Sequence, residues 1–146
     1  QFALPEAVEQ LRALGGAAPG EAITLLNACD PANVAGGSEG EADGSLSPSK
    51  GPSAALRFSR VPSTHVALLA GRPAVVFADS GERITTAADA PEQAIALAIA
   101  TYVSRLNAPR RISVSTWNGE NVLKSPGQAI LKAAGFDRTP GGMGRG

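Results

Sequence analysis

Two apolar segments joined by a tight-turn signal restrict the fold of this chain more than any other feature of its sequence. Residues 65–70 read HVALLA, residues 74–78 read AVVFA, and Gly71-Arg72 separates them. Short apolar runs on either side of a glycine-containing turn are typical of a β-hairpin. Residues 82–86 are expected to add a third strand after a further turn. Consecutive hairpins of this kind predict a small antiparallel sheet that curls into a barrel-like form.

Three segments are expected to form helices. The strongest pattern covers residues 90–106, where the apolar residues form one wide face. A shorter amphipathic pattern covers residues 5–14. The third helix is expected to begin after Ser125-Pro126 and to end at Gly135. Together with the strands, these helices predict the α+β class.

Further short strands are expected in the C-terminal part of the chain. Residues 112–117 alternate between apolar and polar side chains, and the Asn-Gly pair at 118–119 is a hairpin-turn signal. Residues 122–123 are then expected to form the return strand of this hairpin. A last strand is expected at residues 136–139, before a glycine-rich tail.

A single domain is expected to include the whole chain, residues 1–146. Within it, residues 36–54 contain no apolar residue larger than Leu46, so this segment is expected to be a flexible loop. Residues 1–50 carry two basic and seven acidic residues, and the remainder carries eleven basic and six acidic residues. A basic C-terminal half is suited to a phosphate backbone, although a solvated surface of mixed charge explains the same counts.

The composition excludes several kinds of site. Cys29 is the only cysteine and His65 the only histidine, so the chain alone forms no disulfide and no structural zinc site, which needs about four Cys or His ligands. No Gly-Lys-Ser/Thr triplet is present, which excludes the phosphate-binding loop of an ATP motor. The lack of a disulfide fits a reducing cytoplasm, where we expect this protein. No apolar stretch approaches the roughly 20 residues that span a bilayer. The chain starts with Gln1 rather than Met, which indicates a fragment of a longer protein.

Blocks of residues distributed over nearly the whole chain resemble the C-terminal domain of the large helicase-related (Lhr) family of bacterial DNA helicases. The family has an N-terminal FALPEAV-like helix, a strand that runs into Asp-Pro-Ala-Asn, and a hairpin with glycine at its tip. A long alanine-rich helix follows, then an Asn-Gly or Asp-Gly turn with VL-SP, and a closing AAGF-TP-G. Here the blocks occupy residues 2–8, 30–33, 71, 91–106, 118–119, 122–126 and 133–141. The family's aromatic, proline-rich stretch after Asp-Pro-Ala-Asn is replaced by a polar insertion.

The resemblance implies a 3′-to-5′ ATP-dependent helicase that tracks along single-stranded DNA and takes part in DNA repair. ATP and Mg²⁺ would bind in a motor far upstream, and this fragment would hold no cofactor and no metal. The family's C-terminal extension is similar to AlkZ-type DNA glycosylases, so this chain would be a final, non-motor, barrel-like module. It would contribute nucleic-acid binding and self-association. Its expected partners are single-stranded DNA or an RNA:DNA hybrid, the upstream domains and a second copy, but no membrane.

The same resemblance raises catalysis by Asp79 as an alternative. The glycosylases use a Gln-x-Gln or Gln-x-Asp pair near the damaged nucleotide, and in this chain the pair falls on Phe77 and Asp79. A carboxylate there would support an oxocarbenium ion or position a water during cleavage at an anomeric carbon. However, Phe77 cannot do the work of a glutamine. Asp79 also precedes Ser80-Gly81, where aspartate is a common turn former.

Four residues are candidates for nucleic-acid binding. Arg105, Arg110 and Arg111 lie at a helix-to-strand connection, where they either contact a phosphate backbone or end the helix in solvent. Trp117 either stacks on a base or anchors the core beside the Asn-Gly turn. His65 is expected to be a packed or surface histidine rather than a general base. A purely structural or oligomerisation module, without DNA contact, remains a third hypothesis.

Overall fold

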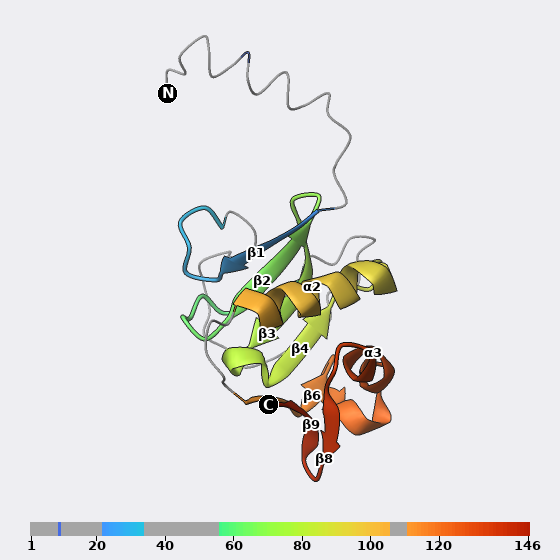
Figure 1. Cartoon of the computed structure of the whole chain (residues 1–146). Coiled ribbons are helices and arrows are strands. Elements are labelled where there is room, and N and C mark those ends of the chain that lie inside the picture. The colour runs from blue at the N-terminus through green and yellow to red at the C-terminus, as the bar shows by residue number, and fades with distance from the viewer. Residues whose placement is uncertain (1–8, 10–21, 34–55, 106–110) are drawn as a thin grey trace.

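The computed structural model confirms the α+β class that the sequence predicts (Figure 1). It describes residues 9, 22–33, 56–105 and 111–146. The expected helix over residues 5–14 lies outside the described residues except for Glu9, which is helical, and so does the expected loop over residues 36–54. The other two expected helices are present as α2 (Glu92–Arg105) and α3 (Gly127–Ala133).

Six strands form the larger of two sheets, in the order β1-β2-β3-β4-β6-β7. Neighbouring strands are antiparallel except for β4 and β6, which are parallel. Among the described strands β1 and β7 form the two edges, so the sheet is open and does not close into a barrel. The predicted antiparallel pairing is therefore present in most of the sheet, whereas the predicted barrel-like closure is not. The strands are β1 (Ile23–Asn27), β2 (His65–Leu69), β3 (Arg72–Ala78), β4 (Arg83–Thr86), β6 (Thr116–Trp117) and β7 (Glu120–Asn121).

Strands β2 and β3 form the predicted hairpin, but its turn lies one residue earlier than expected. Ala70 and Gly71 make the turn with φ values of 51° and 77°, and Arg72 already pairs with Leu69. Two consecutive positive φ values match a type I′ turn, whose twist fits that of the flanking strands. Alanine is rarely found in the left-handed region, so Ala70 gives no turn signal in the sequence although it occupies the turn.

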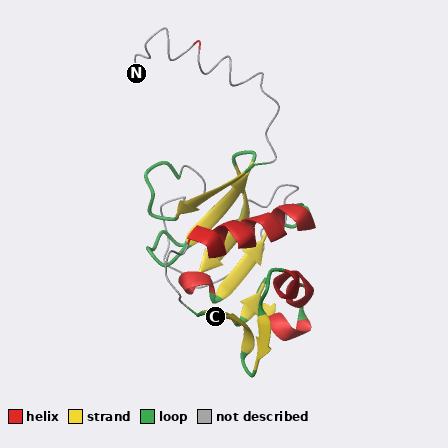
Figure 2. Ribbon diagram, viewed as in Figure 1, coloured by secondary structure: helices red, strands yellow, loops and turns green. Residues whose placement is uncertain are grey.

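Helix α2 crosses one face of the larger sheet and covers its core (Figures 1 and 2). It packs against β1 and β3, and the buried helix residues recur at spacings of three and four, as an amphipathic helix requires. Ile95, Ala98, Ile99 and Tyr102 join apolar residues of both sheets and of α3 in one continuous cluster. The buried residues of α2 are Ala94, Ile95, Ala98, Ile99 and Tyr102.

A second sheet of three antiparallel strands has the order β5-β9-β8. Its central strand is formed by the glycine-rich segment that was expected to be a tail. A side chain at Gly142 would place its Cβ only 2.0 Å from the carbonyl oxygen of Val114, so glycine permits this close approach of two backbones. Met143, the next residue of the strand, is buried and anchors the strand in the core. The strands are β5 (Ile112–Val114), β8 (Asp137–Thr139) and β9 (Gly142–Arg145).

The Asn-Gly turn between β6 and β7 is confirmed. Asn118 and Gly119 have φ values of 50° and 83°, which again match a type I′ turn. The side-chain oxygen of Asn118 accepts a hydrogen bond of 2.7 Å from the backbone N–H of Thr86. The turn is thereby tied to the end of β4.

The prediction of a return strand at residues 122–123 is wrong. The return strand is the short β7, and the chain then enters a 3₁₀ turn, η2 (Val122–Lys124). The side chain of Asn121 caps this turn by accepting a hydrogen bond of 2.9 Å from the backbone N–H of Leu123. Because an asparagine cap of this kind favours a helical turn over continued strand, the hairpin ends before the apolar pair.

Candidate functional site

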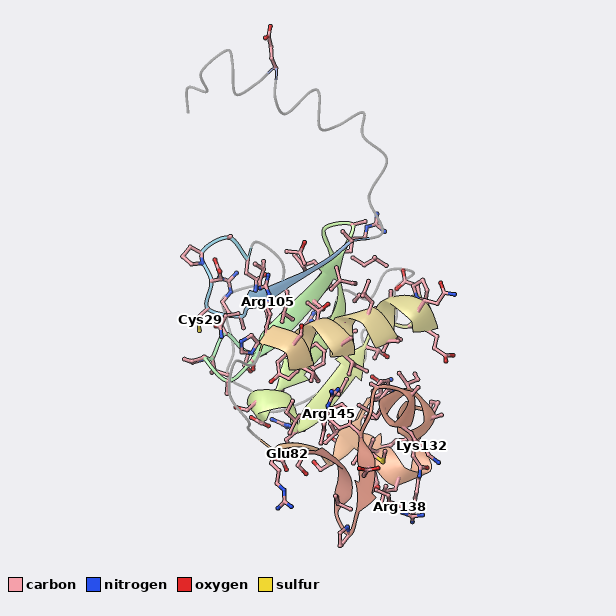
Figure 3. All side chains as sticks on the ribbon, viewed as in Figure 1. Cys29, Glu82, Arg105, Lys132, Arg138 and Arg145 are labelled. Atoms are coloured by element: carbon pink, nitrogen blue, oxygen red, sulfur yellow. The ribbon has the colours of Figure 1, made fainter. Side chains whose placement is uncertain are left out.

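A cavity of about 300 Å³ lies where β1 ends, β2 begins and helix α2 reaches its C-terminus. Figure 3 labels Arg105 and Cys29 on this side of the molecule. The volume is at the lower end of the range for ligand pockets, about 300–1,000 Å³, and suits one small group. The wall combines apolar, amide, imidazole, carboxylate and guanidinium groups. The lining residues are Leu25, Leu26, Asn27, Asp30, His65, Tyr102 and Arg105.

The Asp-Pro-Ala-Asn block forms a turn that is built by its own side chains. One carboxylate oxygen of Asp30, Oδ1, accepts a hydrogen bond of 2.9 Å from the N–H of Ala32. Asn33 is buried, and its amide donates to the carbonyl oxygen of Ala28. These bonds fix the backbone of the turn. The other carboxylate oxygen of Asp30, Oδ2, accepts no hydrogen bond from the part of the chain that the structure describes.

Three hydrogen bonds fix the orientation of the Asn27 amide and, with it, the tautomer of His65. The Asn27 oxygen accepts from the N–H of Cys29 at 2.9 Å, and its nitrogen donates to the carbonyl oxygen of Pro62 at 2.8 Å. The same nitrogen lies 3.4 Å from Nε2 of His65. Because that nitrogen can only donate, Nε2 acts as the acceptor, and the neutral ring carries its proton on Nδ1.

Aromatic packing holds His65 in this neutral form. Its ring meets the ring of Tyr102 edge to face, with centroids 5.5 Å apart, and Tyr102 stacks on Phe77 at 4.2 Å. Nδ1 of His65 is buried and has no hydrogen-bond partner among the described residues. Burial lowers the pKa of His65 and raises the pKa of Tyr102, because it disfavours the charged form of each side chain. Both rings are therefore neutral near pH 7.

Arg105 brings a positive charge to the wall of the cavity. One terminal nitrogen of its guanidinium donates a hydrogen bond of 2.7 Å to the carbonyl oxygen of Leu25. This bond turns the side chain from the last turn of α2 back over β1. Within the described ranges, the ion pair between Asp79 and Arg83 is the only one, so no carboxylate there neutralises Arg105. The remaining N–H groups are available to an anionic ligand.

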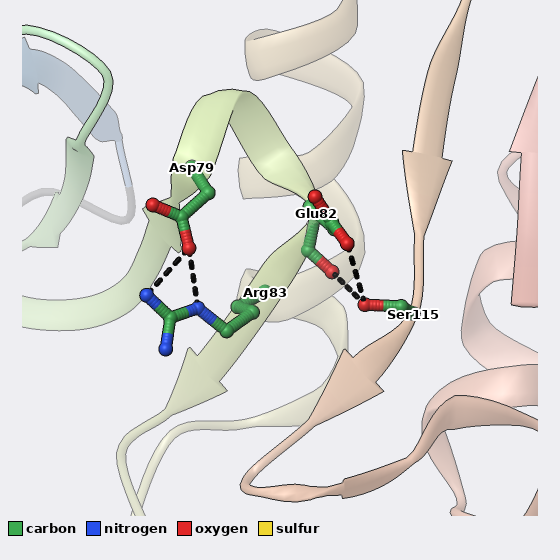
Figure 4. A network of polar contacts seen from close by, with 4 residues as sticks. All are labelled: Asp79, Glu82, Arg83 and Ser115. Carbon is green, nitrogen blue, oxygen red and sulfur yellow. Dashed lines mark hydrogen bonds and ion pairs between the residues drawn. The ribbon is translucent and has the colours of Figure 1, made fainter.

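Asp79 lies away from this cavity, at the connection between β3 and β4. Its exposed carboxylate forms an ion pair with Arg83, and the neighbouring Glu82 accepts hydrogen bonds from Ser115 (Figure 4). Phe77, the other member of the glycosylase-like pair, is buried in the core. The position of Asp79 in a short 3₁₀ turn, with φ of 50°, fits the turn role that the sequence left open.

The other candidate residues are separated from one another. Trp117 is only 3% exposed and its ring lies against Gly127, so it occupies the position of a core anchor and offers no free face to a base. Arg105 lines the cavity, whereas Arg111 is exposed and precedes β5 in the second sheet. Arg110 lies outside the described residues.

Three polar residues of the cavity, Asn27, Asp30 and Tyr102, are not among the predicted site residues. The available signal was the density of polar groups directly after a predicted strand, because side chains at strand ends frequently line binding sites. That signal does not reveal the contribution of Arg105, whose partner Leu25 is 80 residues away in sequence.

No protein-family model matches the chain, and no curated protein matches it. No helix in the described part is long and apolar enough to cross a membrane. The described residues also hold no group of three or more His, Cys, Asp or Glu side chains placed to bind a metal ion.

Proposed function

We propose that this chain is the non-motor C-terminal module of an Lhr-type ATP-dependent 3′-to-5′ DNA helicase that acts in DNA repair in the cytoplasm. In this proposal the module binds nucleic acid, and an upstream motor binds ATP and Mg²⁺. The order of the motif blocks along the chain supports the family. The observation that carries nucleic-acid binding is the guanidinium of Arg105, which lines a cavity and forms no ion pair with a carboxylate among the described residues.

A guanidinium in this position is well suited to a phosphate. Arginine presents several N–H donors in a planar fork that matches phosphate oxygens. Among the described residues, Leu25 engages one terminal nitrogen of Arg105 and no other residue engages the rest. A cavity of about 300 Å³ accepts one unstacked group rather than a duplex. Single strands present such groups, because their bases and phosphates are not held in a regular helix. These features support a single strand, rather than a duplex, as the proposed ligand.

The proposal is tested by fluorescence anisotropy of the 146-residue chain with a labelled single-stranded oligonucleotide over a range of salt concentrations. We expect measurable binding that weakens as salt increases. Replacing Arg105→Gln removes one phosphate contact, which should reduce the slope of log affinity against log salt by about 0.7. Arg72→Gln is the matched control, since Arg72 is an exposed arginine at the start of β3, beside the end of β2 that lies away from the cavity.

Equal loss of affinity in both variants would mean that overall charge, and not the cavity, governs binding. No binding by the unchanged chain at low salt would contradict the proposal itself. Arg110→Glu combined with Arg111→Glu examines the second candidate contact, and we expect this pair of changes to weaken binding further. Self-association is the other proposed contribution, and sedimentation of the chain at several concentrations measures it directly.

A further inference from the structure

The cavity wall carries two opposite charges that are not in direct contact. Arg105 and Asp30 both line it, yet they form no ion pair. Arg105 retains N–H donors, and Oδ2 of Asp30 retains acceptor capacity within the described part of the chain. A cation and an anion in the wall of one small cavity favour a ligand with an anionic group for Arg105 and hydrogen-bond donors for Asp30.

We infer that this cavity binds one unpaired nucleotide of a single strand, with a phosphate on Arg105 and the N–H groups of the base on Asp30. The inference rests on the proposed function and names the recognition chemistry of that same site. A carboxylate only accepts hydrogen bonds. Among the DNA bases, guanine alone presents a ring N–H and an amino group side by side. The structure therefore favours guanine at this position.

The remaining wall offers a base a small, uncharged surface. Leu26 and His65 are partly exposed, whereas Tyr102 is 3% exposed and lies against the His65 ring. Burial opposes ionisation of both rings, so they are uncharged near neutral pH. A neutral imidazole does not compete with Arg105 for the phosphate. It also does not pair with the carboxylate of Asp30. The two charged residues are thereby left to separate parts of the nucleotide.

Thymine is the informative comparison. Its one ring N–H lies between two carbonyl oxygens, which repel a carboxylate, whereas its phosphate is the same as that of guanine nucleotides. A labelled pentanucleotide with one central guanine among thymines should bind the 146-residue chain about tenfold more tightly than the all-thymine pentanucleotide, equivalent to about 1.4 kcal/mol. Fluorescence anisotropy measures both affinities under one salt condition.

Two substitutions separate the two contacts. Asp30→Asn keeps an oxygen for the N–H of Ala32, so the turn is retained, but it removes the charge. We expect it to abolish the preference for guanine by weakening the guanine strand relative to the all-thymine strand, which should bind more tightly because the charge that repels its carbonyl oxygens is gone. Arg105→Gln should weaken both strands by the same factor. Arg72→Gln, outside the cavity, should change neither.

His65 provides a readout on the unchanged protein. Because it is the only histidine, the NMR signals of its ring protons are unambiguous. The guanine strand should shift them, and the all-thymine strand should shift them less. Equal binding of both strands, with unmoved His65 signals, would overturn the inference while leaving nucleic-acid binding intact. Failure of both strands to bind would instead contradict the proposed function.

Discussion

Gly127 illustrates how strongly a single residue can be constrained in this molecule. A Cβ at this position would lie 2.1 Å from the ring of Trp117, which is itself buried. A Gly→Ala change in an exposed helix usually stabilises by roughly 0.5–1 kcal/mol. Here the sign should reverse, because the ring cannot move without disturbing the core. We predict that Gly127→Ala lowers the free energy of unfolding by about 1–3 kcal/mol, measured by urea denaturation.

Gly141→Ala is the matched control for this prediction. No atom lies within 4 Å of the place that its Cβ would occupy, and the residue is exposed. The free energy of unfolding of the Gly141→Ala variant should remain close to that of the unchanged chain. If Gly127→Ala were as stable as Gly141→Ala, the close packing of Trp117 on α3 would be refuted.

His65 should give the protein a pH-dependent stability. In the unfolded chain a histidine takes up a proton near pH 6.5, whereas burial lowers the pKa of the folded residue. Below about pH 6.5 the unfolded state therefore binds more protons. We predict that the free energy of unfolding falls as the pH decreases below this value, until the folded pKa is passed. Urea denaturation at several pH values between about 5 and 7.5 measures the effect.

The substitution His65→Gln supplies the comparison. Glutamine keeps an acceptor for the amide of Asn27 but does not titrate. In this variant the fall in stability over the same pH interval should be smaller. An identical pH profile in both proteins would show that burial of His65 does not govern the effect.

At the scale of single elements, the β2–β3 hairpin carries a residue that fits its turn poorly. Ala70 adopts φ of 51°, and alanine in the left-handed region costs about 1–2 kcal/mol. Asn-Gly is the preferred pair for a type I′ turn. We predict that Ala70→Asn raises the free energy of unfolding by about 0.5–1 kcal/mol. Thermal unfolding followed by circular dichroism detects this gain.

The opposite change tests the same reasoning. Ala70→Val places a β-branched side chain at positive φ and should destabilise the protein. A Val variant that unfolds at the same temperature as the Asn variant would exclude turn strain as the cause.

The elements that sequence patterns predict correctly are those whose signals are local. The strands flanking the first hairpin and helix α2 have clear periodicity, and the Asn-Gly turn at 118–119 needs two positive φ values that these residues tolerate. Strand β9 escaped prediction because its glycines resemble a tail. Their actual role is to let Gly142 approach the backbone of Val114, a contact between residues far apart in the chain.

At the scale of the whole molecule, the candidate site was only partly predictable. Arg105 was singled out, but as one of three neighbouring arginines and not as part of a cavity. Its place there depends on Leu25, and the pairing of Asn27 with His65 joins residues 38 positions apart. Such contacts exist only after β1 and β2 pair and α2 packs across them. Local periodicity therefore identifies the elements, whereas the site emerges from their arrangement.

The helicase assignment is tested most directly by the DNA sequence upstream of the codon for Gln1. The proposal predicts a long open reading frame in the same phase, with a Gly-Lys-Thr phosphate-binding loop and an Asp-Glu-x-His box before this module. A start codon immediately before Gln1, with no motor encoded upstream, would contradict the assignment.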